Sequence, residues 1–179
     1  SNFDRPEVLS DVLATLREVS AELPLVCALH PRTRANIERF ELSHLIDGPN
    51  MVVLPPQGYL EMLGLQASAT LVLTDSGGIQ EEAPSFGIPA FVLRETTERP
   101  EGIEAGVLEL VGTDENRVYE RAAALLSDPE AYAAMSKAAN PYGDGRASQR
   151  IVQAILHWFG LSPEPPEPFR PVPRKGEKS

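Results

Sequence analysis

The stretch LVLTDSGGIQEEAP, residues 71–84, decides which fold the sequence predicts. Residues 71–74 are apolar or β-branched, which is typical of a strand buried on both faces in a parallel sheet. Residues 75–78 then form a glycine-rich turn, and a helix is expected to start within residues 79–83. A strand, a glycine-rich turn and a helix together present backbone N–H groups and the positive end of a helix dipole to an anion.

The side chains around this turn point to a nucleotide ligand. Gly77 and Gly78 have no Cβ atom, so a phosphate can approach their backbone closely, and Ser76 adds a hydroxyl donor. Glu82 comes four residues after Gly78 and therefore faces the same side of the helix, where a carboxylate suits the two hydroxyls of a ribose. A plain strand-to-helix connection with a solvated Glu82 explains the same residues, because two adjacent glycines are a weak motif.

The rest of the chain alternates apolar runs of strand length with helical patterns. The further runs are residues 24–29, 51–54, 89–93 and 107–111. The helical patterns begin near residues 4, 33, 58, 113, 128 and 144, with caps expected at Asp4, at Thr113 or Asp114, at Asp128 and at Asp144. This alternation predicts an α/β fold with a Rossmann-like parallel sheet and helices on both faces. We assign residues 1–161 to one α/β domain and residues 162–179, which are proline-rich and charged, to a disordered tail.

Composition limits the possible partners and chemistry. The chain has 179 residues, a formal net charge of −10 and a pI of about 4.8, which argues against nucleic acid or an anionic membrane as a partner. Cys27 is the single cysteine, so neither an internal disulfide nor a cysteine metal cluster is expected. No signal peptide or apolar segment of membrane length is present in the sequence, so we expect a cytoplasmic location.

Candidate ligand contacts follow four of the predicted strands. They are His30, the turn at residues 55–59, the turn at residues 75–78 and the segment 94–99. Ligands bind beyond the carboxyl ends of the strands in sheets of this kind, so we expect these segments to converge on one rim. A serine hydrolase is excluded because the Gly-x-Ser-x-Gly elbow is missing around Ser76.

Three sequence words carry a resemblance to a known family. They are TDSGGIQEEAP at residues 74–84, LRETTERPE at residues 93–101 and NPYGDGRA at residues 140–147. In the same order and at similar spacing, they resemble the non-hydrolysing UDP-N-acetylglucosamine 2-epimerases. The resemblance runs from about residue 2 to residue 159 and covers only the C-terminal half of that family's enzyme. It implies the C-terminal domain of a two-domain GT-B-type fold, with a UDP site in residues 1–161.

The resemblance assigns the diphosphate and ribose contacts to residues 74–84 and 93–101. The positions that match the family's diphosphate and ribose contacts are Ser76, Gly77, Gly78 and Glu82. Arg99 matches the family's phosphate arginine, whose planar fork meets two oxygens at once. Taken alone, an arginine between acidic neighbours more often forms a surface ion pair of little energetic worth.

The resemblance also assigns the base and the reacting sugar. His30, in a His-Pro context, matches a histidine near the reacting centre and is our candidate catalytic residue within this chain. Gln57 lies in the turn that reads the uracil, largely through backbone atoms. Met62, a further candidate UDP contact in the same segment, stands where many members have phenylalanine, and methionine is adaptable enough to replace it.

The resemblance implies an isomerase. The family interconverts UDP-N-acetylglucosamine and UDP-N-acetylmannosamine by eliminating UDP and adding it back, without a metal or redox cofactor, and the full-length enzyme is expected to be a homodimer. Its main acid–base carboxylates belong to an N-terminal domain that these residues do not match, so we expect this chain alone at most to bind UDP. The C-terminal domain of a GT-B glycosyltransferase, a non-catalytic UDP-binding module and the hydrolysing relatives remain alternatives.

Overall fold

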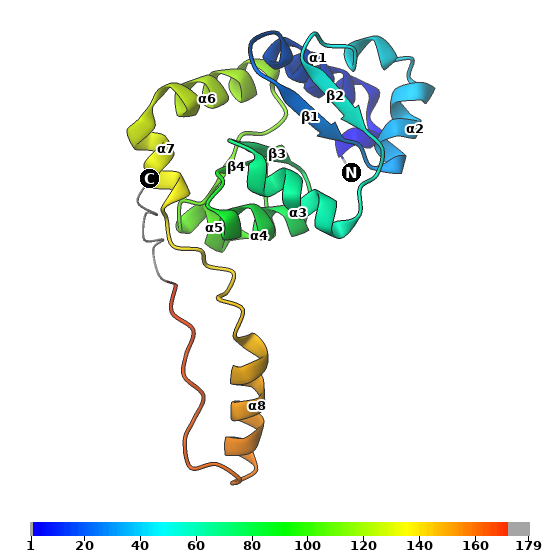
Figure 1. The fold of residues 1–179 in the computed structure, drawn as a ribbon. Helices are drawn as coiled ribbons and strands as arrows, with labels where there is room; N and C mark the ends of the chain where they lie inside the picture. The colour runs from blue at the N-terminus through cyan, green and yellow to red at the C-terminus, as the bar shows by residue number, and fades with distance from the viewer. Residues whose placement is uncertain (1, 172–179) are drawn as a thin grey trace.

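Strands and helices alternate along the chain in the computed structural model, which describes residues 2–171 (Figure 1). The strands are β1 (Leu25–Ala28), β2 (Met51–Leu54), β3 (Val72–Thr74), β4 (Ala90–Val92) and β5 (Leu108–Leu110). The α-helices are α1 (Pro6–Glu22), α2 (Pro31–Arg39), α3 (Tyr59–Ser68), α4 (Gly77–Glu82), α5 (Pro100–Glu104), α6 (Glu115–Ser127), α7 (Pro129–Ser136) and α8 (Ala147–Trp158). Short 3₁₀ helices are η1 (Asn2–Asp4), η2 (Ser43–Leu45) and η3 (Ala83–Phe86). The predicted α/β class is confirmed.

All strand pairs are parallel, but the strands form two sheets. β1 pairs with β2, with Leu25 opposite Met51 and Ala28 opposite Leu54. β3, β4 and β5 form a three-stranded sheet in that order. Each predicted strand is therefore present, whereas the single sheet implied by the prediction is replaced, within residues 2–171, by the separate sheets β1–β2 and β3–β4–β5.

Helix α1 packs beside both sheets and joins them. Pro6 occupies its first turn, and its apolar stripe is buried. Leu9 and Leu13 pack with Ile37 of α2, while Val12 belongs to a second cluster with Phe91 of β4. Full burial of an aliphatic side chain stabilises a fold by roughly 1.5–3 kcal/mol, so one helix supports both halves of the core.

Strand β4 is buried on both faces, as expected for a parallel strand covered by helices. Phe91 points into the cluster formed with α1 and α6. Its neighbours Ala90 and Val92 point the other way, into a cluster with Ala83 of η3 and Val107 ahead of β5. All three β4 residues have no exposed surface. The helices on both faces confirm the Rossmann-like arrangement around this sheet.

The helix starts follow local capping chemistry. Asp114 and Asp128 accept backbone N–H groups at the starts of α6 and α7, as predicted. Other starts differ from the prediction: α1 begins at Pro6, with Arg5 rather than Asp4 as its N-cap. α2 begins at Pro31 rather than residue 33, because His30 is its N-cap and accepts the N–H of Arg32. α8 begins after Arg146, and Asp144 is not its N-cap but accepts the Arg146 N–H and pairs with Arg150.

The C-terminal segment returns alongside α8 (Figure 1). Residues 162–171 contain no helix or strand, but Gln153 donates to Ser162 Oγ at 2.9 Å and to the Glu164 carbonyl at 2.7 Å. Residues 172–179 of the predicted tail lie outside the described residues. Disorder of the tail stays a prediction. Within residues 2–171, no helix is both long and apolar enough to cross a membrane.

Candidate functional site

The turn between β3 and α4 is held by a buried hydroxyl. Thr74, only 6% exposed, accepts the Ser76 N–H through Oγ1 at 3.0 Å. Ser76 is the N-cap of α4, and its carbonyl accepts the Gln80 N–H at 3.2 Å. The N–H groups of Gly77, Gly78 and Ile79 therefore precede the first helical hydrogen bond and have no acceptor within the helix. They form a row of donors at the positive end of α4.

A guanidinium and a hydroxyl flank these glycines. A Cβ atom added to Gly77 would lie 4.0 Å from Nη2 of Arg99, and one added to Gly78 would lie 3.9 Å from Oγ of Ser76. One cationic and one neutral donor group thus flank one stretch of bare backbone. Such a set suits an anion with several oxygen atoms, such as a diphosphate.

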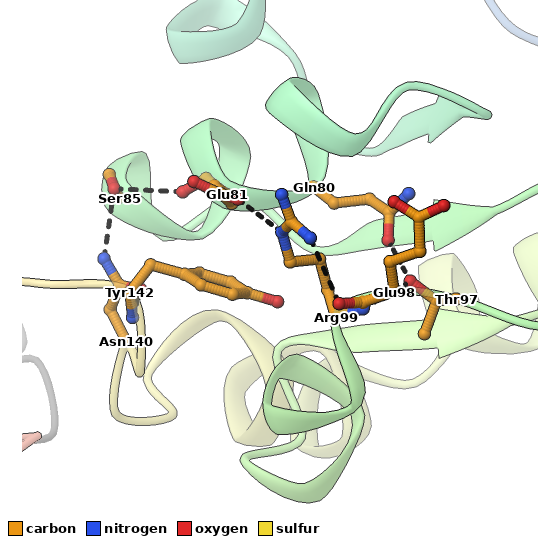
Figure 2. A network of polar contacts seen from close by, with 8 residues as sticks. All are labelled: Gln80, Glu81, Ser85, Thr97, Glu98, Arg99, Asn140 and Tyr142. Carbon is orange, nitrogen blue, oxygen red and sulfur yellow. Dashed lines mark hydrogen bonds and ion pairs between the residues drawn. The ribbon is translucent and has the colours of Figure 1, made fainter.

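Arg99, on the loop that follows β4, is held by contacts with α4 and with its own loop. Arg99 donates through Nε to the Glu81 carboxylate and through Nη1 to the Glu98 carbonyl at 3.1 Å (Figure 2). The hydrogen bond to Glu81 raises the pKa of the Arg99 guanidinium, so the arginine keeps its charge. Thr97 Oγ1 accepts the Arg99 N–H at 3.1 Å and donates to Gln80 Oε1 at 2.5 Å. Gln80 is 1% exposed, so the loop is fastened to the interior side of α4.

A cleft of about 480 Å³ lies on the adjoining face of α4. Its walls are α3, α4, η3 and the loop that precedes α8. The lining residues are Tyr59, Leu63, Gly78, Glu81, Glu82, Ser85, Phe86, Tyr142, Gly143 and Gly145. Gly78 and Glu82 line the same cleft, as their spacing predicts. Glu82 Oε2 accepts a hydrogen bond from Nε2 of Gln66, a buried residue of α3, at 2.7 Å.

The loop at residues 140–146 closes one side of this cleft. Asn140 donates to Ser85 Oγ at 3.0 Å and accepts the Tyr142 N–H at 3.0 Å. In Figure 2 the Tyr142 hydroxyl points toward Arg99. Burial raises the pKa of Tyr142 to about 12, so the hydroxyl stays protonated at neutral pH. The cleft-lining residues of this loop, Tyr142, Gly143 and Gly145, therefore add an uncharged wall beside the charged residues.

Comparison with known proteins assigns the family. The family model described as UDP-N-acetylglucosamine 2-epimerase matches residues 1–156. The chain belongs to the UDP-N-acetylglucosamine 2-epimerase family. The resemblance of the three sequence words is thereby confirmed.

Relatives of this chain match most of its length, and those of known structure share its fold. The UDP-N-acetylglucosamine 2-epimerase of Bacillus subtilis is 42% identical over 91% of this chain and 43% of its own length. The S. aureus MnaA–UDP co-structure is 39% identical, with a TM-score of 0.78 over 91% of this chain and 45% of that one. The UDP-GlcNAc 2-epimerase of Neisseria meningitidis bound to UDP-GlcNAc is 38% identical, with a TM-score of 0.76 over 84% of this chain and 41% of that one. The chain spans less than half the length of these epimerases.

Of the residues that the epimerase resemblance assigned, Gly78 and Glu82 line the cleft, and Ser76, Gly77 and Arg99 lie at the adjoining turn. His30, Gln57 and Met62 belong to neither group. His30 is exposed at the carboxyl end of β1, and its Nδ1 accepts the Arg32 N–H. Gln57, after β2, donates to the Pro55 carbonyl of its own turn at 2.7 Å. Met62 is half-buried on α3. The structure thus groups Ser76, Gly77, Gly78, Glu82 and Arg99, whereas His30 and Gln57 follow strands of the other sheet.

Two contacts of the candidate site were not predicted from sequence. Gln66 and Gln80 hold Glu82 and Thr97 from the protein interior. The sequence signal for Gln66 is a polar residue next to the apolar position Leu65, within a helix that carries Leu60 and Leu63.

No group of three or more metal-ligating side chains occurs within residues 2–171. Burial raises the pKa of the Cys27 thiol to about 11, so this cysteine is a protonated core residue.

Proposed function

We propose that this chain is the nucleotide-binding half of a UDP-N-acetylglucosamine 2-epimerase and that it binds UDP at the β3–α4 turn. The observation that carries the proposal is the meeting of Arg99 Nη2, Ser76 Oγ and the bare backbone of Gly77 and Gly78 at one turn. Membership of the epimerase family and the relatives bound to UDP or UDP-GlcNAc support it.

The diphosphate lies against the turn in this proposal. The backbone N–H groups and the Ser76 hydroxyl are uncharged donors to the diphosphate oxygens, and Arg99 supplies the positive charge. This local set of donors explains how a chain with a net charge of −10 can bind a dianion.

The ribose lies one helical turn further along α4. Glu82 presents one carboxylate oxygen to Gln66 and directs the other to the vicinal hydroxyls of the sugar. Gln57 and its turn read the uracil, Met62 packs near them, and His30 contacts the reacting sugar.

The reaction assigned to the whole enzyme is elimination of UDP and its re-addition with C2 protonated from the other face. Negative charge grows on the departing diphosphate, and Arg99, Ser76 and the N–H row stabilise that charge as it develops. Proton transfer at C2 needs acid–base groups on both faces of the sugar ring. We assign these groups to a part of the enzyme beyond this chain. A homodimer of the whole enzyme and a cytoplasmic location remain expectations.

Calorimetry with UDP, uridine and ADP tests the binding site. We expect UDP to bind more tightly than ADP because of the uracil-reading turn, and more tightly than uridine because of the diphosphate. Equal affinities for UDP and ADP would remove the uracil assignment. In a parallel incubation with UDP-N-acetylglucosamine, NMR should show no manno epimer from this chain alone. Epimer formation would contradict the requirement for a second half, and free N-acetylmannosamine would indicate a hydrolysing enzyme.

A further inference from the structure

Buried polar side chains gather at the proposed UDP site. The buried polar residues among those described are Thr15, Ser20, Gln66, Thr74 and Gln80. Thr15 and Ser20 bond to carbonyls of their own helix α1. Each of the other three instead contacts the glycine-rich turn, the Arg99 loop or Glu82. Burying a polar group costs free energy unless it is fully paired, so this concentration requires a local reason.

Gln66 is the costliest of the three for folding. It is 3% exposed, and its Nε2 donates to Glu82 Oε2 at 2.7 Å. Its Oε1 atom is buried and has no hydrogen-bond partner within residues 2–171. An unpaired buried acceptor destabilises the folded state, whereas an apolar side chain of the same size would not. Stability alone therefore does not explain a glutamine at this position of α3.

We propose that Gln66 is a positioning residue that orients the Glu82 carboxylate for the ribose of the nucleotide. The inference rests on the proposed function. A glutamate side chain has three rotatable bonds, and fixing it only when the ligand arrives lowers affinity. The hydrogen bond from Gln66 fixes Oε2 of Glu82 before binding. The other oxygen is then held toward the cleft that Glu82 and Gly78 share.

The first test is Gln66→Met, which keeps an unbranched side chain of similar length but removes the donor. We expect UDP affinity to fall about fivefold, the effect of losing one hydrogen bond. The melting temperature should stay the same or rise, because the unpaired Oε1 is removed as well. Gln153→Met, the same substitution on the exposed helix α8, is the matched control and should leave UDP affinity unchanged.

The second test is Gln66→Glu, which replaces the amide donor by a carboxyl group. Two neighbouring carboxylates cannot both stay ionised easily, so the pair takes up a proton as the pH falls, and the protonated carboxyl group then donates to its partner. We expect UDP affinity relative to the unsubstituted chain to be low at about pH 8 and to recover toward about pH 5. Tyr59, Glu81 and Tyr142, the other titratable groups of the cleft, are present in both proteins and cancel in this ratio. Gln66→Met should show no such recovery.

The outcomes separate this inference from the proposed function. Unchanged UDP affinity in Gln66→Met, with reduced affinity in Glu82→Gln, would overturn the positioning role and leave the UDP site in place. A Gln66→Glu variant whose relative affinity does not change with pH would overturn it as well. Failure of the unsubstituted chain to bind UDP would overturn both the inference and the proposed function.

Discussion

Arg99 and Glu81 form an ion pair beside the proposed phosphate site. Nε of Arg99 donates to the Glu81 carboxylate, while Nη2 of the same guanidinium faces the backbone of Gly77. The arginine side chain is 31% exposed and the glutamate side chain 42%. The carboxylate thus orients the guanidinium toward Gly77 but also places a negative charge beside any bound phosphate.

Glu81→Gln separates these two effects. An amide oxygen can still accept the Arg99 hydrogen bond, but the negative charge is gone. We expect UDP affinity to rise about two- to threefold, as befits a partly exposed charge, and uridine affinity to stay the same. Calorimetry at low and high salt measures both ligands. A fall in UDP affinity would mean that the charge of Glu81 is needed to orient Arg99.

Glu82→Gln and Arg99→Ala should weaken contacts with different parts of the nucleotide, the ribose and the diphosphate. Glu82→Gln removes one acceptor at the ribose and should weaken both UDP and uridine by about 1–3 kcal/mol with little dependence on salt. Arg99→Ala removes an ionic contact, so it should weaken UDP but hardly uridine and should flatten the salt dependence of UDP binding. Titrations of both ligands at two salt concentrations check this. Equal losses of uridine affinity in both variants would contradict the assignment.

Gly102→Ala should destabilise the fold next to the site. A Cβ atom at Gly102 would overlap the Tyr142 hydroxyl and lie 2.5 Å from Cδ1 of Leu108, a buried residue. We expect a loss of about 1–3 kcal/mol in the free energy of unfolding, the usual cost of overpacking. Gly64→Ala is the control, since a Cβ atom there meets nothing within 4 Å. Urea unfolding should show the control to be as stable as the unsubstituted chain or more so, because alanine favours helices.

Local features of the site could be predicted from sequence. The turn at residues 75–78 follows a strand and opens a helix, as the apolar run and the two glycines indicate. The spacing of Gly78 and Glu82 places both on the cleft, because the helical period alone fixes that relation. The Asp114 and Asp128 caps were predictable for the same reason, since a cap is a contact within a few residues.

Features that depend on distant parts of the chain could not be predicted. Apolar patterns identify strands but not their neighbours, so the division between β1–β2 and β3–β4–β5 left no sequence signal. Leu60, an apolar residue of the helix predicted near residue 58, is 76% exposed, while Gln66 of the same helix is buried. The contact of Gln66 with Glu82 joins residues 16 positions apart. Only the packing of α3 against η3 and α4 brings such residues together.

Thr97→Val tests whether the loop after β4 must be hydrogen-bonded to α4 for Arg99 to bind the diphosphate. Thr97 accepts the Arg99 N–H and donates to buried Gln80, and valine keeps the shape but makes neither hydrogen bond. The released loop should let Arg99 move away from Gly77, so UDP affinity should fall about five- to tenfold, the effect of losing one or two hydrogen bonds, while uridine affinity is unchanged. Thr96→Val, at the exposed neighbouring position, is the control and should bind UDP normally. Calorimetry with UDP and uridine measures both variants. If Thr97→Val loses both ligands equally, the loop supports the whole site and not the arginine alone.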